Sequence, residues 1–356
     1  RGLGDVYKRQ VFIGPDVHIG TDEYNKKEAE QYRYFTDRYL KYIEKYGKTP
    51  RMWGGLKWLP GKTPVKAEGV TVNAWSYDWV DPEVSLKDGY KLINTCDTYL
   101  YIVPGAGYYR EFLDHQWLYE TWTPWMINRK QTLPEGTPGV LGGMFAVWND
   151  YIGNGITFKD IHHRAYPAMQ TLSLKMWTGA VDDLSFARFD SCRRALSEAP
   201  GVNIGAKVKT MDGKVLQVSK LKRNQKLLIE EIGYDYEVAF DFTAKSADKG
   251  SVLFKSSNAI LYQSSPKSGK LAFWSDGYLN EFDYMFPIGQ RVQIVIKGDH
   301  TSTSLYIDGK LHQTLDKKIL YKIGEEVVYY QSTLVFPLAF TGNFSGQLLN
   351  LKVLQK

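Results

Sequence analysis

The hydrophobic pattern of this 356-residue chain changes once, and that change limits the folds it can adopt. Between residues 11 and 200, short apolar runs alternate with amphipathic helical patterns, an order typical of parallel βαβ units. From residue 226 to 356, apolar and polar side chains alternate with period two, which predicts antiparallel strands. The sequence therefore predicts an α/β domain over 11–200, a linker over 201–225 and an all-β domain over 226–356.

The N-terminal pattern contains five strand candidates rather than eight. The first is the run VFIGPDVHIG from residue 11, and the others lie at 51–54, 70–75, 91–103 and 139–148. Helix candidates cover 26–46, 160–177 and 184–196. Because a complete (β/α)8 barrel takes about 250 residues, we expect either an open sheet or the C-terminal part of a TIM barrel.

The C-terminal pattern reads as a series of short strands. Examples are YEVAFDF (236–242), KLAFWSD (270–276), RVQIVIKGD (291–299) and LLNLKVLQ (348–355). Asp308-Gly309 is a typical two-residue hairpin turn. Many short strands separated by turns predict an antiparallel β-sandwich of the jelly-roll kind.

The first ten residues, RGLGDVYKRQ, do not resemble the start of a secreted protein. They contain three basic residues and lack the apolar segment of a signal peptide. The string is similar to a translated adaptor sequence, so residues 1–10 are left out of the fold prediction. We then expect this chain to be an N-terminally truncated fragment of a longer protein.

Composition excludes several classes of protein. The 45 basic and 39 acidic residues give a net charge of +6 without a long basic run, so nucleic acid is not an expected partner. The chain contains no apolar stretch of the roughly 20 residues that a membrane span needs. Cys96 and Cys192 are far apart, which excludes a disulfide framework and a four-cysteine zinc site. Neither a metal nor another cofactor is expected.

The aromatic residues are unevenly distributed along the chain. Of 10 tryptophans, only Trp274 lies after residue 180. Aromatic rings pack in cores, and their flat apolar faces also suit the C–H faces of sugars. The N-terminal domain is therefore a candidate for carbohydrate binding.

The strongest local signal is HIGTDEY, residues 18–24, at the end of the first strand candidate. Catalytic side chains of a barrel come from the C-terminal ends of its strands. Since adjacent strand residues point to opposite faces, Asp22 and Glu23 can share one pocket only if the strand has already ended, and Gly20 makes that geometry plausible. Two neighbouring carboxylates can divide acid and base roles, although a solvated loop or a helix N-cap explains such a pair equally well.

This motif resembles the catalytic signature of family 20 glycoside hydrolases, the β-N-acetylhexosaminidases and lacto-N-biosidases. The resemblance covers roughly residues 11–180. Later strand ends carry aromatic residues in the order in which that family places those of its sugar pocket: Trp53 in MWGG, Trp75 in NAWS, Tyr99 in TYLY and Trp148 in VWND.

The resemblance implies a substrate-assisted retaining mechanism, in which the 2-acetamido oxygen of the substrate attacks the anomeric carbon. Asp22 would orient the acetamido N–H, and Glu23 would serve as general acid and then as general base. Tyr99 would donate a hydrogen bond to the acetamido oxygen. The pocket walls would be Trp53, Trp75 and Trp148, and the sugar hydroxyls would be held by Asp150. The substrates would be N-acetylhexosamine-containing glycans, which predicts an extracytoplasmic bacterial enzyme.

Two departures from the family pattern keep alternatives open. Many hexosaminidases have glutamate at the position of Asp150 and an acidic residue at that of Tyr101. An aspartate after this tryptophan resembles the pattern of lacto-N-biosidases, which release a disaccharide. The family also draws an arginine and a histidine from strands that would lie upstream of this chain. We therefore expect weak activity from the fragment itself, and a non-catalytic carbohydrate-binding protein is a further alternative.

Several further residues are candidates for a role in the site or in the core. His18 is a candidate partner of the two carboxylates or an ordinary strand-end histidine. Trp117, Trp122 and Trp125 either form outer sugar subsites or pack in the core. His162 and His163 are adjacent in a helix pattern and do not have the i, i+4 spacing of metal ligands. Cys96 is expected to be buried and inert.

The C-terminal domain resembles laminin-G-like, concanavalin-like jelly rolls. The resemblance rests on WSDGYLNEF (274–282), VQIVIKGDHTSTSLYIDGK (292–310) and GQLLNLKVLQ (346–355). Such modules often accompany glycosidases, where they bind sugar or pack against the catalytic domain. Neither an aromatic platform nor an acidic cluster of the kind that binds calcium stands out in the sequence, which favours a structural role.

Overall fold

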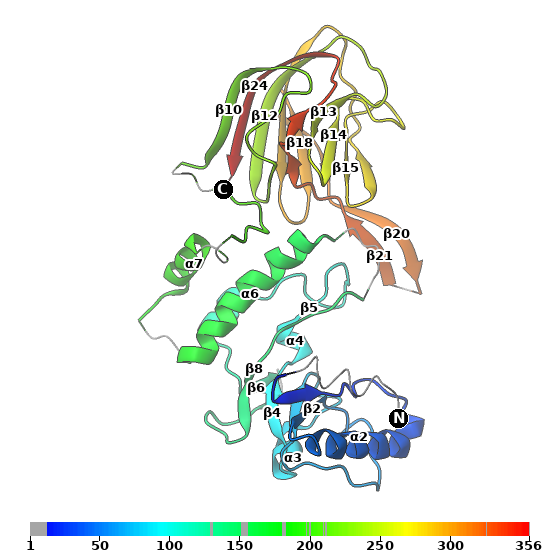
Figure 1. Ribbon diagram of the computed structural model, residues 1–356, viewed down its shortest axis with the longest axis vertical. Coiled ribbons are helices and arrows are strands. Elements are labelled where there is room, and N and C mark those ends of the chain that lie inside the picture. Colours follow the sequence, from blue (N-terminus) through cyan, green and yellow to red (C-terminus); the bar gives the residue numbers. More distant parts are fainter. Residues whose placement is uncertain are drawn as a thin grey trace. The chain divides into compact units, whose positions relative to one another are not determined.

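The computed structural model describes residues 13–128, 131–150, 156–179, 183–196, 198, 201–208, 210, 212–324 and 326–355. The proposed adaptor segment 1–10 lies outside them. The chain divides into two compact units, which are considered one at a time (Figure 1). The first comprises Arg1–Val103, Tyr108–Trp148 and Ala165–Ala195, and the second Pro104–Gly107, Asn149–Arg164 and Leu196–Lys356.

A parallel sheet forms the centre of the first unit. Its strand order is β1-β2-β3-β4-β8, and the strands span Asp16–His18, Thr49–Trp53, Thr71–Ala74, Lys91–Asn94 and Val140–Gly143. Neighbours pair in parallel register, for example Trp53 with Asn73. The βα order expected from the sequence is confirmed. The sheet is open, and no closed barrel is seen within the described residues, so a TIM barrel stays a prediction.

Helices of this unit match the sequence prediction closely. The predicted helix 26–46 consists of the 3-10 turn η1 (Lys26–Glu28) and α2 (Ala29–Glu44), and α2 packs against β2. The side chain of Asp81 accepts a hydrogen bond of 3.1 Å from Val84 N and so caps the start of α3 (Pro82–Lys87). The other helices of the chain are α4 (Asp97–Leu100), α5 (His115–Glu120), α6 (Phe158–Thr178) and α7 (Phe186–Ala195).

Two of the predicted strands each divide into two. The run 91–103 forms β4, α4 and β5 (Tyr101–Ile102), and the run 139–148 forms β8 and β9 (Ala146–Val147), which pairs with β5. The break after β4 follows from Asn94, whose buried amide donates to Pro124 O at 3.0 Å and Met126 O at 2.9 Å, while its oxygen accepts from Cys96 N at 3.0 Å. These bonds turn the chain out of the sheet. A further hairpin joins β6 (Met126–Asn128) to β7 (Gln131–Thr132).

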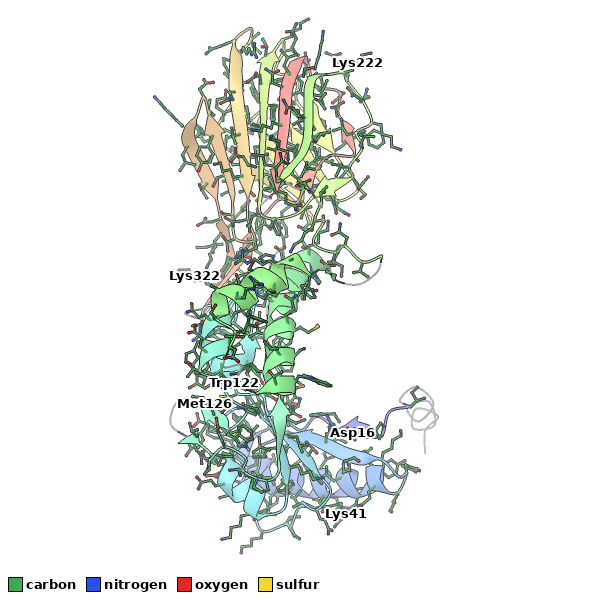
Figure 2. All side chains as sticks on the ribbon, turned by 90° about the vertical axis from the view of Figure 1, so that its left-hand side faces the viewer. Asp16, Lys41, Trp122, Met126, Lys222 and Lys322 are labelled. Carbon is green, nitrogen blue, oxygen red and sulfur yellow. The ribbon has the colours of Figure 1, made fainter. Side chains whose placement is uncertain are left out.

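Trp122 is the largest fully buried side chain of the core of this unit. It packs in one cluster with Tyr99, Leu118 and Leu172, and Met126 lies against the same cluster (Figure 2). A Cβ at Gly143 of β8 would lie 2.4 Å from the Trp122 ring, so the glycine is needed for this close approach. Cys96 is buried in the same cluster, and burial raises the pKa of its thiol to about 12, which fits the predicted inert role.

The second unit contains the expected β-sandwich. One sheet has the order β10-β24-β12-β17-β18-β19, which span Lys214–Leu221, Gly346–Gln355, Tyr236–Ala244, Arg291–Gly298, Thr303–Ile307 and Lys310–Leu315. The other has the order β16-β15-β14-β13-β23, which span Tyr278–Glu281, Ala272–Ser275, Ala259–Tyr262, Val252–Lys255 and Phe340–Thr341. Two smaller pairs are β11 (Glu231–Ile232) with β22 (Phe336–Pro337), and β20 (Lys317–Ile323) with β21 (Glu326–Gln331).

Period-two alternation fixes which side chains enter the sandwich core. Buried and partly exposed residues alternate along all of β12, so that Val238, Phe240 and Phe242 face the same apolar cluster. The predicted hairpin turn joins β18 to β19, with φ of 47° at Asp308 and 80° at Gly309. The predicted linker 201–225 contains β10, whose Leu221 pairs with Leu348 of β24, so the sandwich takes in part of that segment.

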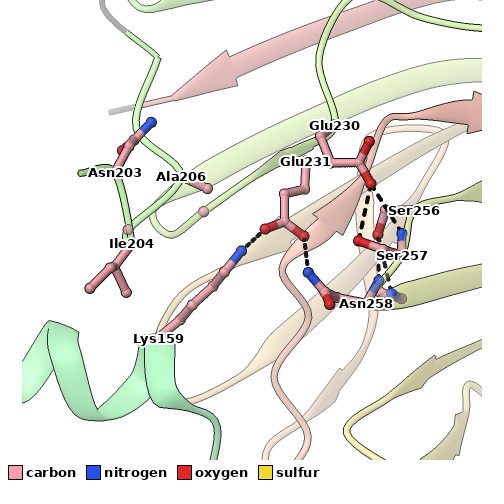
Figure 3. A network of polar contacts seen from close by, with 12 residues as sticks. Lys159, Asn203, Ile204, Ala206, Glu230, Glu231, Ser256, Ser257 and Asn258 are labelled. Carbon is pink, nitrogen blue, oxygen red and sulfur yellow. Dashed lines mark hydrogen bonds and ion pairs between the residues drawn. The ribbon is translucent and has the colours of Figure 1, made fainter. Parts of the chain in front are cut away.

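Polar contacts attach the first turns of α6 to the sandwich within this unit (Figure 3). Lys159 forms an ion pair with Glu231, and Glu231 in turn accepts a hydrogen bond of 3.1 Å from Asn258 Nδ2. One turn later, the fully buried Arg164 donates to Gln331 Oε1 at 2.7 Å. Each of these buried cations thereby gains a partner, which lowers the cost of removing its charge from water.

His163 and His300 stack on each other in this region, with ring centroids 4.5 Å apart. Burial lowers the pKa of His163 to about 3, and it also lowers the pKa of His300. Charged or titratable groups facing the two rings are Arg164, Lys207, His162, Asp299, Asp235 and Asp160.

We expect the sandwich unit to lose stability as the pH falls below about 6.5, the ordinary pKa of histidine. The unfolded chain then takes up protons that the folded unit refuses until about pH 3, which is the pKa of His163. From pH 7 to pH 5 the free energy of unfolding should drop by about 1–2 kcal/mol. Hydrogen exchange of β12 and β17, corrected for intrinsic rates, measures this change.

The variant His163→Gln should remove most of that pH dependence. The matched control is His312→Gln, because His312 is an exposed residue of β19. Equal pH dependence in His163→Gln and the parent chain would show that the buried pair does not carry the effect.

Candidate functional site

The carboxyl ends of the parallel strands bring several predicted site residues to one edge of the sheet. His18 is the last residue of β1, Trp53 is the last residue of β2, and Trp75 directly follows β3. All of these strands pair in parallel register, so their ends lie side by side. The sheet thereby collects residues that are more than fifty positions apart in the sequence.

A sharp turn directly after β1 carries the two carboxylates. Gly20 and Thr21 both have positive φ, at 79° and 73°, and this takes the chain out of the strand direction. Trp53 N donates to Gly20 O at 2.8 Å, and the Tyr32 hydroxyl donates to Thr21 O at 2.7 Å. Asp22 and Glu23 are exposed beyond this turn, past the last residue of β1. Because they lie outside the strand, their side chains need not point to opposite faces of the sheet.

Four rings beside this turn form a continuous aromatic chain, made of His18, Trp53, Trp148 and Tyr101. Their successive ring centroids are 5.3, 5.8 and 5.7 Å apart. Trp148 remains 36% exposed, whereas Tyr101 is buried. The aromatic chain therefore presents an accessible apolar surface at the edge where the carboxylates leave the sheet.

Asp22 is electrostatically coupled to this aromatic chain. Removal of water from one side of the imidazole lowers the pKa of His18, and a hydrogen bond with Asn73 and the charge of Asp22 oppose that shift. Burial raises the pKa of Tyr101, and the charges of Asp97 and Asp22 raise it further. At neutral pH the imidazole is therefore neutral, and the Tyr101 hydroxyl keeps its proton.

Trp75 lies beside the aromatic chain and has no ring contact with it among the described residues. Its Nε1 donates to Gly54 O at 2.8 Å, and its ring lies 5.4 Å from that of Trp79. Trp79 in turn contacts Trp58, with centroids 5.3 Å apart. Trp75 is buried, so only a small part of its surface is accessible at the site.

Tyr99 packs in the core of the first unit, and Asp150 is an exposed residue of the chain segment after Trp148. Tyr99 belongs to α4 rather than to a strand end, and it packs on Trp117 with ring centroids 4.6 Å apart. It is buried in the core that contains Trp122. Asp150 is exposed two residues after Trp148. The structure thus brings His18, Trp53 and Trp148 into one aromatic chain with the charge of Asp22 beside His18, and the roles suggested for Tyr99 and Asp150 stay predictions.

The suggested role of Trp122 in an outer sugar subsite is wrong, because its side chain is fully buried beneath β8. Trp117 covers Tyr99 from α5. Trp125 lines a cavity of about 350 Å³ together with residues of β8 and the end of α6. Trp125 is therefore the member of this group that faces open space.

Sequence reasoning missed one residue and misjudged another. Asn73 is buried in β3, donates to Thr95 Oγ1 at 3.0 Å and bonds His18. A polar residue in the apolar run VTVNAW was the available signal. Tyr101 was noted only as a departure from a family pattern, and the structure places it against Trp148.

The described residues contain no group of three or more His, Cys, Asp or Glu side chains that could hold a metal ion. His162, which the sequence places beside His163, pairs with Glu198 at 2.9 Å. Among all the residues that the structure describes, no helix combines the length and apolar character needed to cross a membrane.

A family model and several solved structures are similar to the N-terminal segment. Residues 15–180 match the family model of the glycosyl hydrolase family 20 catalytic domain. No curated protein sequence matches the chain. Similar solved structures include a β-N-acetylhexosaminidase from Bacteroides fragilis NCTC 9343, which is 21% identical with a TM-score of 0.40, over 53% of this chain and 40% of that one. Dispersin B is 18% identical with a TM-score of 0.38, over 47% and 55% respectively, so this chain spans about half the length of either protein or less.

The turn that carries Asp22 and Glu23 should be sensitive to one methyl group. A Cβ at Gly55 would lie 2.5 Å from the Tyr32 hydroxyl, which holds Thr21 O. We expect Gly55→Ala to lower the free energy of unfolding of the N-terminal unit by about 1–3 kcal/mol. Urea unfolding followed by tryptophan fluorescence measures it.

Gly14→Ala is the matched control, because a Cβ at Gly14 would meet no atom within 4 Å. It should change the free energy of unfolding by less than about 0.5 kcal/mol. If both variants unfold alike, the contact between Tyr32 and the turn does not support the site.

Proposed function

We propose that this chain, whose residues 15–180 match the family model of the glycosyl hydrolase family 20 catalytic domain, is a glycosidase that removes terminal β-linked N-acetylhexosamine from glycans. The observation that carries the proposal is the position of Asp22 and Glu23. They follow a sharp turn at the carboxyl edge of a parallel sheet, beside an aromatic chain that includes the accessible ring of Trp148. Carboxylates and flat apolar rings together suit the polar and C–H faces of a sugar.

In the proposed first step, the 2-acetamido oxygen of the substrate forms a bond to the anomeric carbon. The bond from that carbon to the leaving oxygen breaks, and Glu23 gives its proton to the leaving oxygen. Asp22 holds the acetamido N–H and balances the positive charge of the oxazolinium intermediate. The exposure of Glu23 supports this role, because the leaving group must reach its carboxyl group from solvent.

In the proposed second step, water attacks the anomeric carbon and Glu23 takes up its proton. The ring bond to the acetamido oxygen breaks, which restores the acetamide and releases the sugar with its configuration retained. Trp53 and Trp148 would cover the sugar during both steps. Because the pKa of Tyr101 is raised, its hydroxyl keeps its proton and can donate a hydrogen bond to the sugar. A carboxylate at this position could only accept one.

A second candidate, release of a disaccharide, is favoured by Tyr101 and Asp150. A neutral phenol and a short carboxylate stand at positions where many hexosaminidases of this family have acidic residues and glutamate. Fewer anionic acceptors near the terminal sugar would weaken the recognition of a single N-acetylhexosamine. The comparison of p-nitrophenyl N-acetylglucosaminide with p-nitrophenyl lacto-N-bioside distinguishes the two specificities.

Glu23→Gln should lower kcat on the p-nitrophenyl substrate by about 10²–10⁴-fold, because glutamine cannot transfer the proton. Glu28→Gln, in the exposed turn η1, is the matched control and should retain the parent rate. Rates are to be measured on this chain and on the longest reading frame that encodes it. If neither protein cleaves either substrate, or if Glu23→Gln is as active as the parent, the proposal fails.

A further inference from the structure

The side chain of His18 helps to hold the turn that carries Asp22 and Glu23. Gly20 N, two residues before Asp22, donates to His18 Nδ1 at 3.0 Å. Between them lies Thr21, a β-branched residue with a positive φ of 73°, a conformation that persists only where surrounding contacts hold it. The bond from Gly20 to the imidazole is one of these contacts, and it exists only while the ring keeps its orientation.

The imidazole is oriented through its other nitrogen. The side chain of His18 forms a hydrogen bond with that of Asn73, a residue of β3. Because Nδ1 accepts from Gly20, the proton of the neutral ring is on Nε2, and Nε2 is the donor in the bond with Asn73. The acceptor of an amide side chain is its oxygen, so Asn73 Oδ1 must face the ring.

Asn73 is itself held so that its oxygen faces His18. Its Nδ2 donates to Thr95 Oγ1 at 3.0 Å, and the Thr95 hydroxyl donates to Ile93 O of β4 at 3.5 Å. A flipped amide would place two donors face to face at His18. Asn73 and Thr95 are only 2% and 0% exposed, so solvent water does not readily replace a lost partner at either residue.

These bonds form one directed series from the turn after β1 to the main chain of β4, which we call the Asn73 relay. In it, Gly20 donates to His18, His18 to Asn73, Asn73 to Thr95, and Thr95 to Ile93. β1 and β3 are not neighbours in the sheet, since β2 lies between them. The relay therefore joins two strands that the main-chain hydrogen bonds do not join directly.

The Asn73 relay requires a neutral His18. A proton on Nδ1 would face the N–H of Gly20, and two donors cannot form a hydrogen bond. Removal of water from the ring lowers the pKa of His18, the charge of Arg51 lowers it further, and the bond with Asn73 and the charge of Asp22 oppose this without reversing it. The bond from Gly20 should therefore persist below about pH 6.5, the ordinary pKa of histidine.

We propose that Asn73 is a positioning residue of the candidate site. It holds the ring of His18, the ring holds the turn after β1, and the turn sets where Asp22 and Glu23 meet the substrate. The effect on turnover rests on the proposed glycosidase function, whereas the effect on the turn can be measured without turnover. If Asn73 only filled space in the sheet, an apolar residue of similar size would leave the turn unchanged.

Nuclear magnetic resonance of the full chain, with nitrogen-15 in histidine and glycine, tests the effect on the turn. Asn73→Leu replaces the amide with an apolar group of similar size and removes both of its hydrogen bonds. We expect the ring N–H signal of His18 to be lost to exchange with water, and the amide of Gly20 to exchange with solvent about tenfold faster than in the parent chain. The variant His18→Gln identifies the ring signal.

The matched control is Thr71→Val, because Thr71 is also buried and lies on the same face of β3 two residues earlier. It should leave the His18 signal and the exchange of Gly20 as they are in the parent chain. In whichever protein shows turnover, Asn73→Leu should lower kcat about 10–100-fold, because Glu23 is displaced rather than removed. KM should change less than about threefold.

Unchanged exchange of Gly20 in Asn73→Leu, or an equal change in Thr71→Val, overturns the proposal. So does an unchanged kcat in Asn73→Leu where the parent is active. If the parent shows no turnover but Gly20 responds as expected, the glycosidase function fails and the control of the turn by Asn73 stands. Near-ultraviolet circular dichroism identifies loss of the fold, and Thr95→Val, which removes one bond of the relay, then decides: Gly20 should exchange about threefold faster, and an unchanged rate overturns the proposal.

Discussion

Parallel pairing of β1, β2 and β3 is the constraint on which the candidate site depends. It aligns the ends of three strands, so that the turn after His18, the ring of Trp53 and the start of the loop at Trp75 meet at one edge. The hydrogen bond from Trp53 N to Gly20 O joins the aromatic chain to the turn that carries the carboxylates. A shift of one residue in this register would turn Trp53 to the other face of the sheet.

The sandwich obeys a different constraint, because its two sheets must each bury one face. Alternation along β12 and β17 meets that need with apolar side chains alone. The five-stranded sheet is less uniform, since its outward face is partly covered by the loop 263–270 and partly exposed at Trp274 and Phe340.

Much of the fold could be predicted from the sequence, because it follows from periodicity. The helices over 26–46, 160–177 and 184–196 and the sandwich strands all have strong apolar patterns. The split of the run 91–103 could not be predicted, because it depends on three hydrogen bonds made by the single side chain of Asn94. The strand β10 was hidden for another reason: its exposed side chains alternate only weakly with apolar ones, and its pairing with β24 comes from distant sequence.

The site was predictable at the level of residue types, and much less so at the level of contacts. Asp22, Glu23, Trp53 and Trp148 could be selected from motifs at strand ends. The burial of Trp122 and the contact of Tyr101 with Trp148 depend on packing that no local pattern encodes. The family resemblance also suggested a place for Tyr99 in the sugar pocket, and that role stays a prediction beside its packing on Trp117.

The hydrogen bonds that hold the turn after β1 do not use the side chains of Asp22 or Glu23. The Tyr32 hydroxyl donates to the carbonyl of Thr21, and Trp53 N donates to the carbonyl of Gly20. Neither bond involves the side chains of Asp22 or Glu23. The identity of those two side chains can therefore change in evolution at little cost to the fold. Substitutions at these two positions would alter the chemistry of the site while the same backbone persists.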